Sequence, residues 1–305
     1  MMNSNLDNKV VVCFGEILWD VLPSGKTAGG APMNVAYHLQ KLGIASKMVS
    51  RVGDDVPGKN LLKFLEGNDL STQFIQLDKT KDTSEVHAVI GENDEVAYDI
   101  IYPVAWDYIQ WLPEHEDLLK NADAFVFGSL GVRNTVSKET LHKMLEYTDY
   151  RVFDINLRAP HFSAALIAGL LPKSHLVKLN ANELMMMAEW FDPSCTTESA
   201  CVKMMFERFK IQELLVTKGS KGASYYTADK QYDAAAHPVK VKDTIGSGDS
   251  FLAAFLAVKL TGGSVEDALK YAVGMGGFIT SKSGACPAYE KGDLDLFIAS
   301  QERAG

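Results

Sequence analysis

The order of strand-like and helix-like segments constrains the fold of this chain more than any other feature of its sequence. A β-branched run from Val10 breaks at Gly15 and resumes, and GGAPMNVAYHLQKLG follows, with Pro32 suited to the first turn of a helix and Gly43 to its end. KMVSRVGDD then indicates a strand, and PGKNLLKFLEGND a second helix. This β-α-β-α order predicts an α/β fold built on a layered sheet.

The α/β order is interrupted by one segment without a helix. SEVHAVIGENDEVAYDIIY contains two alternating runs around a turn at 91–94, which predicts a β-hairpin. A hairpin inserted into an α/β pattern indicates a second, smaller sheet that forms a lid. After it, AFVFGS, RVFDINLR, LVKLNANE and ELLVTKGSKGASYY indicate strands, and SKETLHKMLEYT and LMMMAEWF indicate helices, so the α/β order returns.

Composition excludes several classes of protein. The chain has 305 residues, 47% of them hydrophobic and 23% charged, which is ordinary for a globular protein with a sizeable core. A net charge of −9 offers no general affinity for nucleic acid or for an anionic membrane. The first residues lack the basic start and apolar stretch of a signal peptide, and no apolar run approaches the roughly 20 residues of a membrane span. We therefore expect a cytoplasmic protein that binds neither nucleic acid nor membranes.

The four cysteines show neither a CxxC pair nor a histidine at metal-ligand spacing. They are Cys13, Cys195, Cys201 and Cys286. This pattern predicts buried or idle thiols in a reducing compartment.

The segment DTIGSGDSFLAAFLAVKL places glycines before an apolar run that reads as a buried helix. Free backbone N–H groups and the helix dipole favour an anion at such a position. Asp249 stands at this position, where its charge would repel a bound phosphate. It is suited instead to accept the proton of an alcohol while the glycine amides stabilise a transferring phosphoryl group. On spacing alone, a helix N-cap is an equally good reading of Asp249.

Two other phosphate-binding motifs are excluded. PSGKT ends like a P-loop, but that motif requires glycine where this chain has Asp20, and a helix after the lysine and threonine. GSGDSF fails the dinucleotide fingerprint, because Phe251 replaces the third glycine and the segment lies far from the first strand. The missing fingerprint argues against an NAD-dependent dehydrogenase.

Two of these segments together resemble the signatures of the PfkB, or ribokinase-like, sugar kinases. DTIGSGDSF resembles the C-terminal signature of that family and GGAPMNVAYHLQKLG its N-terminal signature, with KLNANE and VTKGSKG between them in the family's order. The resemblance covers the whole chain and implies a single kinase domain over residues 1–305. Its fold would be a ribokinase-like three-layer α/β/α sandwich with a small β-sheet lid, formed by segments at about 16–28 and 83–106.

The resemblance also implies roles for the residues of the two signatures. The catalytic base matches Asp249, and the anion hole matches Gly246, Ser247 and Gly248, with serine where alanine is usual. The residues that match the sugar-binding positions are Asp20, Gly29, Gly30, Asn34 and Arg158. Without the family, the glycine pair would read as a strand-to-helix turn, and Arg158 could equally form a salt bridge at a strand end.

Nucleotide and cation sites are implied in the same way. Thr217, Gly219 and Gly222 match the nucleotide-side loop, although a bare TKGSKG more often forms a surface turn. Asn180 and Glu183 match an N-x-x-E motif that organises Mg²⁺, through water; otherwise Glu183 is a first-turn acid favoured by the helix dipole. The family's monovalent cation site, which would hold K⁺, would use Asp243 and the carbonyl groups of Ile245, Ile279, Lys282 and Gly284.

The acceptor is best predicted as a neutral sugar. CFGEILWDVLP, GGAPMNVA and DINLR look most like the fructokinase branch, and the hairpin at 84–102 contains no Lys or Arg to bind a phosphosugar. The segment between Asp20 and Gly29 is short for a fructokinase. We expect ATP- and Mg²⁺-dependent phosphorylation of fructose to fructose 6-phosphate, with a homodimer contact at the exposed edge of the lid sheet. A ribokinase, a 2-keto-3-deoxygluconate kinase, a nucleoside kinase and a catalytically silent sugar-binding regulator are the alternatives.

Overall fold

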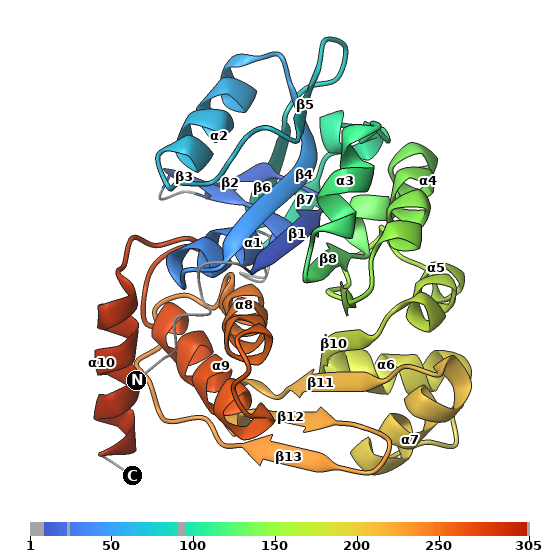
Figure 1. Ribbon diagram of the computed structural model, residues 1–305, viewed down its shortest axis with the longest axis vertical. Helices are drawn as coiled ribbons and strands as arrows, with labels where there is room; N and C mark the ends of the chain where they lie inside the picture. The colour runs from blue at the N-terminus through green and yellow to red at the C-terminus, as the bar shows by residue number, and fades with distance from the viewer. Residues whose placement is uncertain (1–8, 23–24, 91–95, 304–305) are drawn as a thin grey trace.

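A mostly parallel sheet of nine strands forms the centre of the computed structural model, which describes residues 9–22, 25–90 and 96–303 (Figure 1). Its strands, in spatial order, are β13 (Gln231–Ala234), β12 (Ala223–Tyr226), β11 (Glu213–Thr217), β10 (Leu176–Asn180), β9 (Arg151–Asp154), β8 (Ala124–Gly128), β1 (Val10–Phe14), β4 (Ala45–Gly53) and β5 (Ile75–Asp78). β12 pairs antiparallel with both of its neighbours, and all the other neighbouring strands run parallel.

Helices cover both faces of this sheet, because its strands are apolar on both sides. In β1, Val11 and Cys13 belong to one buried hydrophobic cluster, and Val12 and Phe14 belong to another. The first cluster includes residues of α1 (Ala31–Lys41), α2 (Val56–Glu66), α8 (Ser247–Leu260), α9 (Val265–Thr280) and α10 (Lys291–Glu302). The second includes residues of α3 (Glu114–Lys120), α4 (Thr135–Met144), α5 (Ala164–Leu170), α6 (Ala181–Phe191) and α7 (Glu198–Phe209). The predicted three-layer α/β/α fold is confirmed.

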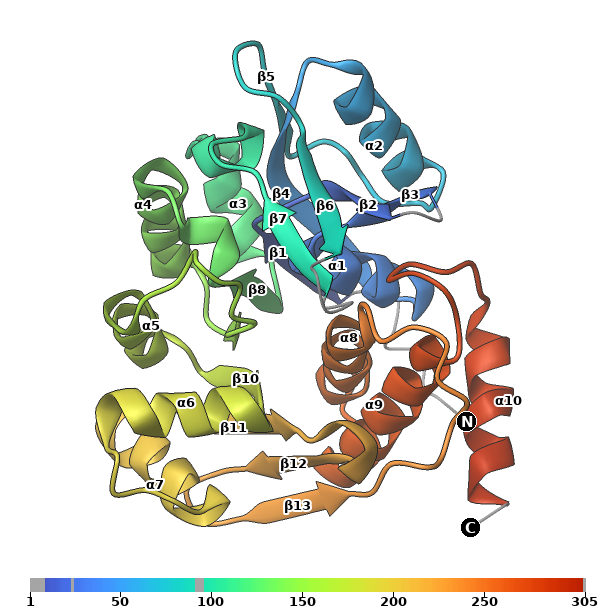
Figure 2. The same ribbon diagram turned by 180° about the vertical axis from the view of Figure 1, so that it is seen from behind.

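The predicted smaller sheet is also present. Its strand order is β3 (Gly25–Gly29), β2 (Leu18–Leu22), β6 (Ser84–Ile90) and β7 (Val96–Ile100). β6 and β7 form the predicted antiparallel hairpin, and β2 joins β6 in parallel (Figure 2). The turn predicted at 91–94 lies outside the described residues.

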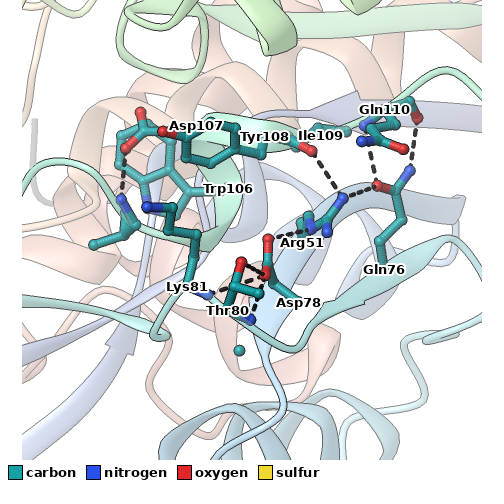
Figure 3. A network of polar contacts seen from close by, with 12 residues as sticks. Arg51, Gln76, Asp78, Thr80, Lys81, Trp106, Asp107, Tyr108, Ile109 and Gln110 are labelled. Carbon is teal, nitrogen blue, oxygen red and sulfur yellow. Dashed lines mark hydrogen bonds and ion pairs between the residues drawn. The ribbon is translucent and has the colours of Figure 1, made fainter.

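A network of polar contacts holds both ends of this hairpin against the large sheet (Figure 3). Arg51 on β4 forms an ion pair with Asp78, 2.8 Å between Nε and Oδ2, and Asp78 also accepts hydrogen bonds from the segment that leads into β6. Arg51 also donates to the carbonyl oxygen of Tyr108, at 3.1 Å, in the 3₁₀ turn that follows β7. The lid sheet is therefore tied to β4 and β5 of the large sheet.

Helix α8 is buried through its centre, as its sequence predicts. Ten consecutive residues, from Asp249 to Val258, are buried. Its amino end lies near the carboxyl ends of the parallel strands, where α/β folds place their ligands. No helix among the described residues is both long and apolar enough to cross a membrane.

Candidate active site

The amino end of α8 presents backbone N–H groups without partners. Gly246 is the N-cap residue and adopts a left-handed conformation with φ of 74°. A Cβ atom there would lie 2.7 Å from both Cα and Cβ of Ala285, so only glycine fits. In the described part of the chain, the N–H groups of Gly246, Gly248 and Asp249 have no hydrogen-bond partner, whereas Ser247 donates to Thr244 at 3.3 Å. This end of the helix can therefore bind an anion through several amides.

Asp249 is the third residue of α8 and is buried, with 8% of its surface exposed. It is not the N-cap, because Gly246 holds that position and no side chain caps the helix. Instead, its Oδ2 accepts a hydrogen bond from Asn34 Nδ2 at 2.8 Å. Burial raises the pKa of Asp249 above its ordinary value, and Lys178, Asn34 and Arg158 act in the opposite direction. A buried carboxyl group next to open amides is the arrangement that a general base for phosphoryl transfer needs.

Lys178 and Asp154 belong to the same site, although the sequence did not single them out. Lys178 Nζ is buried and forms an ion pair with Asp154 Oδ2 at 2.7 Å. A Cβ atom on Gly248 would lie only 3.2 Å from that Nζ, which places the ammonium group directly beside the mouth of α8. Burial lowers the pKa of Lys178, but Asp154, Asp249 and Glu183 outweigh it and raise the pKa above its ordinary value. The site therefore contains a fixed positive charge where a phosphate would bind.

Acidic groups gather near Asp249 among the predicted sugar-binding residues. Gly29 lies directly against Asp20 Oδ2, and Gly30 against the carbonyl oxygen of Glu16. Burial raises the pKa of Asp20 to about 6 and that of Glu16 to about 7, and the nearby Asp249 raises both, whereas Arg158 lowers both. The structure thus places Gly29 against Asp20, Gly30 against Glu16 and Asn34 against Asp249.

Arg158 is exposed, and in the described structure the one hydrogen bond of its guanidinium group is to the carbonyl oxygen of Leu157, at 3.1 Å. None of the ion pairs among the described residues includes Arg158. The salt bridge at a strand end, which was the alternative to a role in sugar binding, is therefore not formed. Its charge nevertheless lowers the pKa of Glu16, Asp20 and Asp249. This guanidinium group remains available for a ligand.

The predicted nucleotide-side residues line a cavity of ≈ 460 Å³ together with the mouth of α8. Thr217, Gly219 and Gly222 contribute one wall, and Ser247 and Gly248 contribute another. The remaining walls are largely apolar and come from the segment after β13 and from α8, α9 and α10: Ala236, Pro238, Val239, Val241, Phe251, Val273, Gly274, Gly277 and Phe297. A cavity of this size with a largely apolar lining suits a nucleotide base. The sequence identified the loop of this cavity but not the contribution of α9 and α10.

Asn180 and Glu183 form a capping box at the start of α6. Asn180 Oδ1 accepts from the N–H of Glu183 at 2.9 Å, and Glu183 Oε2 accepts from the N–H of Asn180 at 2.8 Å. Glu183 Oε1 also accepts from the N–H of Leu157 at 2.7 Å, and burial raises the pKa of Glu183. The neighbouring Asp154 Oδ1 is buried and has no hydrogen-bond partner among the described residues. The carboxylate oxygens of Glu183 and Asp154 lie near Lys178, beside the position where a phosphate would bind, and they fit a hydrated Mg²⁺ ion.

No cluster of three or more His, Cys, Asp or Glu side chains within residues 9–22, 25–90 and 96–303 is arranged to hold a metal by itself. The residues expected to bind K⁺ nevertheless converge. Asp243 Oδ1 accepts from the N–H of Ile245 at 3.0 Å, and its Oδ2 accepts from the N–H of Gly284 at 2.9 Å. The carbonyl oxygen of Ile279 accepts from the N–H of Lys282 at 2.8 Å.

One of the four cysteines contacts a predicted site residue. Cys13 and Cys201 are buried and Cys195 is partly exposed, as free thiols. Cys286 is also a free thiol, but its Sγ lies 3.3 Å from Asn34 Oδ1, next to Asp249. Burial raises the pKa of Cys286 well above its ordinary value, and Asp249 and Asp20 raise it further. A cysteine alone carries no functional signal in sequence, so only the fold could identify it.

Comparison with known proteins agrees with this geometry. The model of the pfkB family of carbohydrate kinases matches residues 10–291, so the chain belongs to this family of enzymes. A probable fructokinase-5 of Arabidopsis thaliana is 29% identical over 309 residues, covering 92% of this chain and 94% of its own length. A fructokinase of Solanum tuberosum is 28% identical and covers 93% and 94% of the two chains.

Solved structures share the ribokinase-like fold. The fructokinase of Xylella fastidiosa with bound ATP superposes with a TM-score of 0.85 at 22% identity, over 97% of this chain and 99% of that one. The fructokinase of Vibrio cholerae O395 in its fructose-, ADP- and calcium-bound form gives 0.81 at 25% identity, over 96% and 99%. An aminoimidazole riboside kinase of Salmonella enterica, complexed with aminoimidazole riboside and an ATP analogue, gives 0.79 at 22% identity, over 95% and 100%. Kinases of this fold thus accept different hydroxyl compounds.

Proposed function

We propose that this chain transfers the γ-phosphate of ATP to a primary hydroxyl group of a free sugar, and that its acceptor is fructose, phosphorylated at O6. One observation carries the proposal. The carboxyl group of Asp249 and the open amides of Gly246 and Gly248 stand together at the mouth of α8, between an acidic acceptor side and the apolar cavity.

The residues of this chain divide the work of the reaction. Asp249 accepts the proton of the sugar hydroxyl while the oxygen of that hydroxyl attacks the γ-phosphorus of ATP. The bond from the γ-phosphorus to the β–γ bridging oxygen breaks, which releases ADP. The amides at the mouth of α8 and the ammonium group of Lys178 offset the charge on the transferring phosphoryl group. The apolar cavity holds the base of ATP, with Thr217, Gly219 and Gly222 along one wall.

Mg²⁺ is the divalent ion that the proposal requires beside the phosphates. Asn180, Glu183 and Asp154 would hold it, in part through water, and when bound it supplies charge neutralisation for ATP. K⁺ in the loop of Asp243, Ile245, Ile279, Lys282 and Gly284 would fix the backbone that precedes α8.

The charge of the acceptor side supports a neutral sugar. Glu16, Asp20 and Asp249 face Arg158, so carboxyl groups outnumber the cation there. An acceptor that carries a negative charge, such as a phosphosugar or 2-keto-3-deoxygluconate, would be repelled by these carboxylates. Asp20 and Asn34 are suited to hydrogen bonds with sugar hydroxyls, and Arg158 to a hydroxyl or to the phosphoryl group. The fructokinase relatives support fructose among the neutral sugars.

ADP release from Mg-ATP by the purified protein tests the acceptor. Fructose, ribose, 2-keto-3-deoxygluconate, glucose and adenosine are compared at equal concentrations. We expect fructose to give the highest kcat/KM. A preference for another acceptor would refute fructose and keep the mechanism, whereas activity with none would leave a sugar-binding regulator as the better proposal.

The role of Asp249 is tested by D249N. We expect kcat to fall by about three to four orders of magnitude, the usual loss when a key catalytic group is removed, while fructose still binds in calorimetry. D267N is the matched control, because Asp267 holds the third position of α9, the position that Asp249 holds in α8, but its side chain is exposed. Near-normal turnover in D249N would remove Asp249 from the role of base.

A further inference from the structure

A chain of three side chains from distant parts of the sequence ends at the carboxyl group of Asp249. Cys286 Sγ lies 3.3 Å from Asn34 Oδ1, and Asn34 Nδ2 lies 2.8 Å from Asp249 Oδ2. Asn34 is 96% buried, with 4% of its surface exposed, so water does not readily replace either contact. Both ends of the Asn34 amide are therefore held by protein groups.

The loop that carries Cys286 is fixed on both sides of the cysteine. The carbonyl oxygen of Ala285 lies 2.8 Å from His38 Nε2, and the carbonyl oxygen of Pro287 accepts from the Tyr37 hydroxyl at 2.8 Å. Tyr289 OH is also 3.0 Å from His38 Nδ1. Since Asn34, Tyr37 and His38 all belong to α1, this helix sets the position of the thiol relative to the amide.

The chemistry of the three groups determines which way the amide faces. An ionised carboxylate can only accept, so Asn34 must turn its NH₂ group toward Asp249 and its oxygen toward Cys286. A thiol is protonated at neutral pH and can donate to that oxygen. Without a donor at position 286, only the carboxylate of Asp249 still favours this orientation of the amide, whose oxygen has lost the thiol as its donor. If it turned over, its oxygen would face the carboxylate, and the ionised state of Asp249 would be disfavoured.

We propose that Cys286 is a positioning residue for phosphoryl transfer: its thiol holds the Asn34 amide in the orientation that donates to Asp249 and keeps this base ionised. The inference rests on the proposed role of Asp249 as the base. Other charged groups also face Asp249 and are unchanged by substitution of Cys286: Lys178 on β10, Asp154 at the end of β9, Arg158 after β9, and Glu16 and Asp20 between β1 and β3.

Three variants separate the hydrogen bond from the bulk of the side chain. C286A removes the donor, C286S keeps a donor, and C195A removes a thiol from the connection between α6 and α7 as the control. The first readout is the acid limb of the pH dependence of kcat at saturating substrates. The second is the titration of the Asp249 carboxyl carbon by ¹³C NMR in the ligand-free protein, with D249N to identify the resonance.

In C286A, we expect both titrations to move to higher pH by about one unit, the size of one lost hydrogen bond to a charged group. C286S and C195A should titrate like the unchanged protein. An unshifted titration in C286A overturns the inference, and so does a C286S that shifts as far as C286A. High activity in D249N would instead refute the role of Asp249 as base. The NMR titration would still test whether Cys286 affects the ionisation of Asp249.

Discussion

Glu16 shows at the scale of one residue how the acceptor side affects stability. It is 98% buried, with 2% of its surface exposed; its Oε2 has no partner in the described structure, and its Oε1 accepts one long hydrogen bond from Ala31, at 3.3 Å. Burial raises the pKa of Glu16 from 4.5 to about 7. The folded state therefore holds the proton more tightly than the unfolded state, and stability falls as the pH rises from about 4.5 to about 7.

E16Q should remove this pH dependence. At 1.36 kcal/mol per pH unit, the difference in unfolding free energy between E16Q and the unchanged protein should rise by about 3 kcal/mol between pH 4.5 and pH 8. Urea unfolding across this range measures it. E139Q is the control, because Glu139 is an exposed glutamate on α4. A difference between E16Q and the unchanged protein that stays constant with pH would contradict the prediction.

Sequence reasoning reached some of these residues and missed others for a physical reason. Asp249 and Asn34 belong to the two family-like signatures. Glu16 and Lys178 lie in the segments CFGEILWDVLP and KLNANE, where neither was assigned a role, and Cys286 lies outside all of these segments. Lys178 is the one detectable case, since a lysine in the apolar strand LVKLN requires a buried partner. The contact of Cys286 with Asn34 spans 252 residues of sequence, and no local pattern predicts a contact of that range.

The amino end of α8 is the element whose geometry most directly determines the site. Gly246 and Gly262 flank this helix, and both have positive φ, 74° and 84°. Alanine in this conformation costs about 1–2 kcal/mol at either position. At Gly262 a Cβ atom meets nothing within 4 Å, whereas at Gly246 it lies 2.7 Å from Ala285.

G246A should therefore destabilise the protein more than G262A, by a further 1–3 kcal/mol or so from overpacking. It should also lower kcat, because the displaced Ala285 precedes Cys286 and the amides of the anion site move with Gly246. Unfolding free energies and kcat of the two variants measure both effects. Equal destabilisation by the two substitutions would show that the contact with Ala285 is relieved without cost.

The elements that could be predicted are those with strong local patterns. α1, α8 and the hairpin of β6 and β7 follow from capping residues, an apolar run and alternation. β5 and β13 are four-residue strands at the two edges of the large sheet, too short for a clear pattern. α9 and α10 were not identified, although they complete the nucleotide cavity.

In the whole molecule, the small sheet is also tied to helix α2. Asp55, the N-cap of α2, accepts from the N–H of Thr83 at 2.8 Å, immediately before β6, and Trp19 on β2 donates to Pro57 at 3.0 Å. Leu18, Val86 and Ile100 pack into the second hydrophobic cluster. Residues 25–27 of β3 are exposed. The homodimer contact at an edge of this sheet stays a prediction, as does a cytoplasmic location.

This arrangement predicts that the lid becomes protected only when both substrates are bound. Phosphoryl transfer to a sugar must exclude water, and closure of a lid over the acceptor provides that exclusion. Hydrogen–deuterium exchange in β2 and β6 should slow by about tenfold or more with fructose and a non-hydrolysable Mg-ATP analogue together, which corresponds to 1.4 kcal/mol of added protection. β11, in the interior of the large sheet, is the internal control. Unchanged exchange in β2 and β6 with both ligands bound would show that the small sheet does not close over the acceptor.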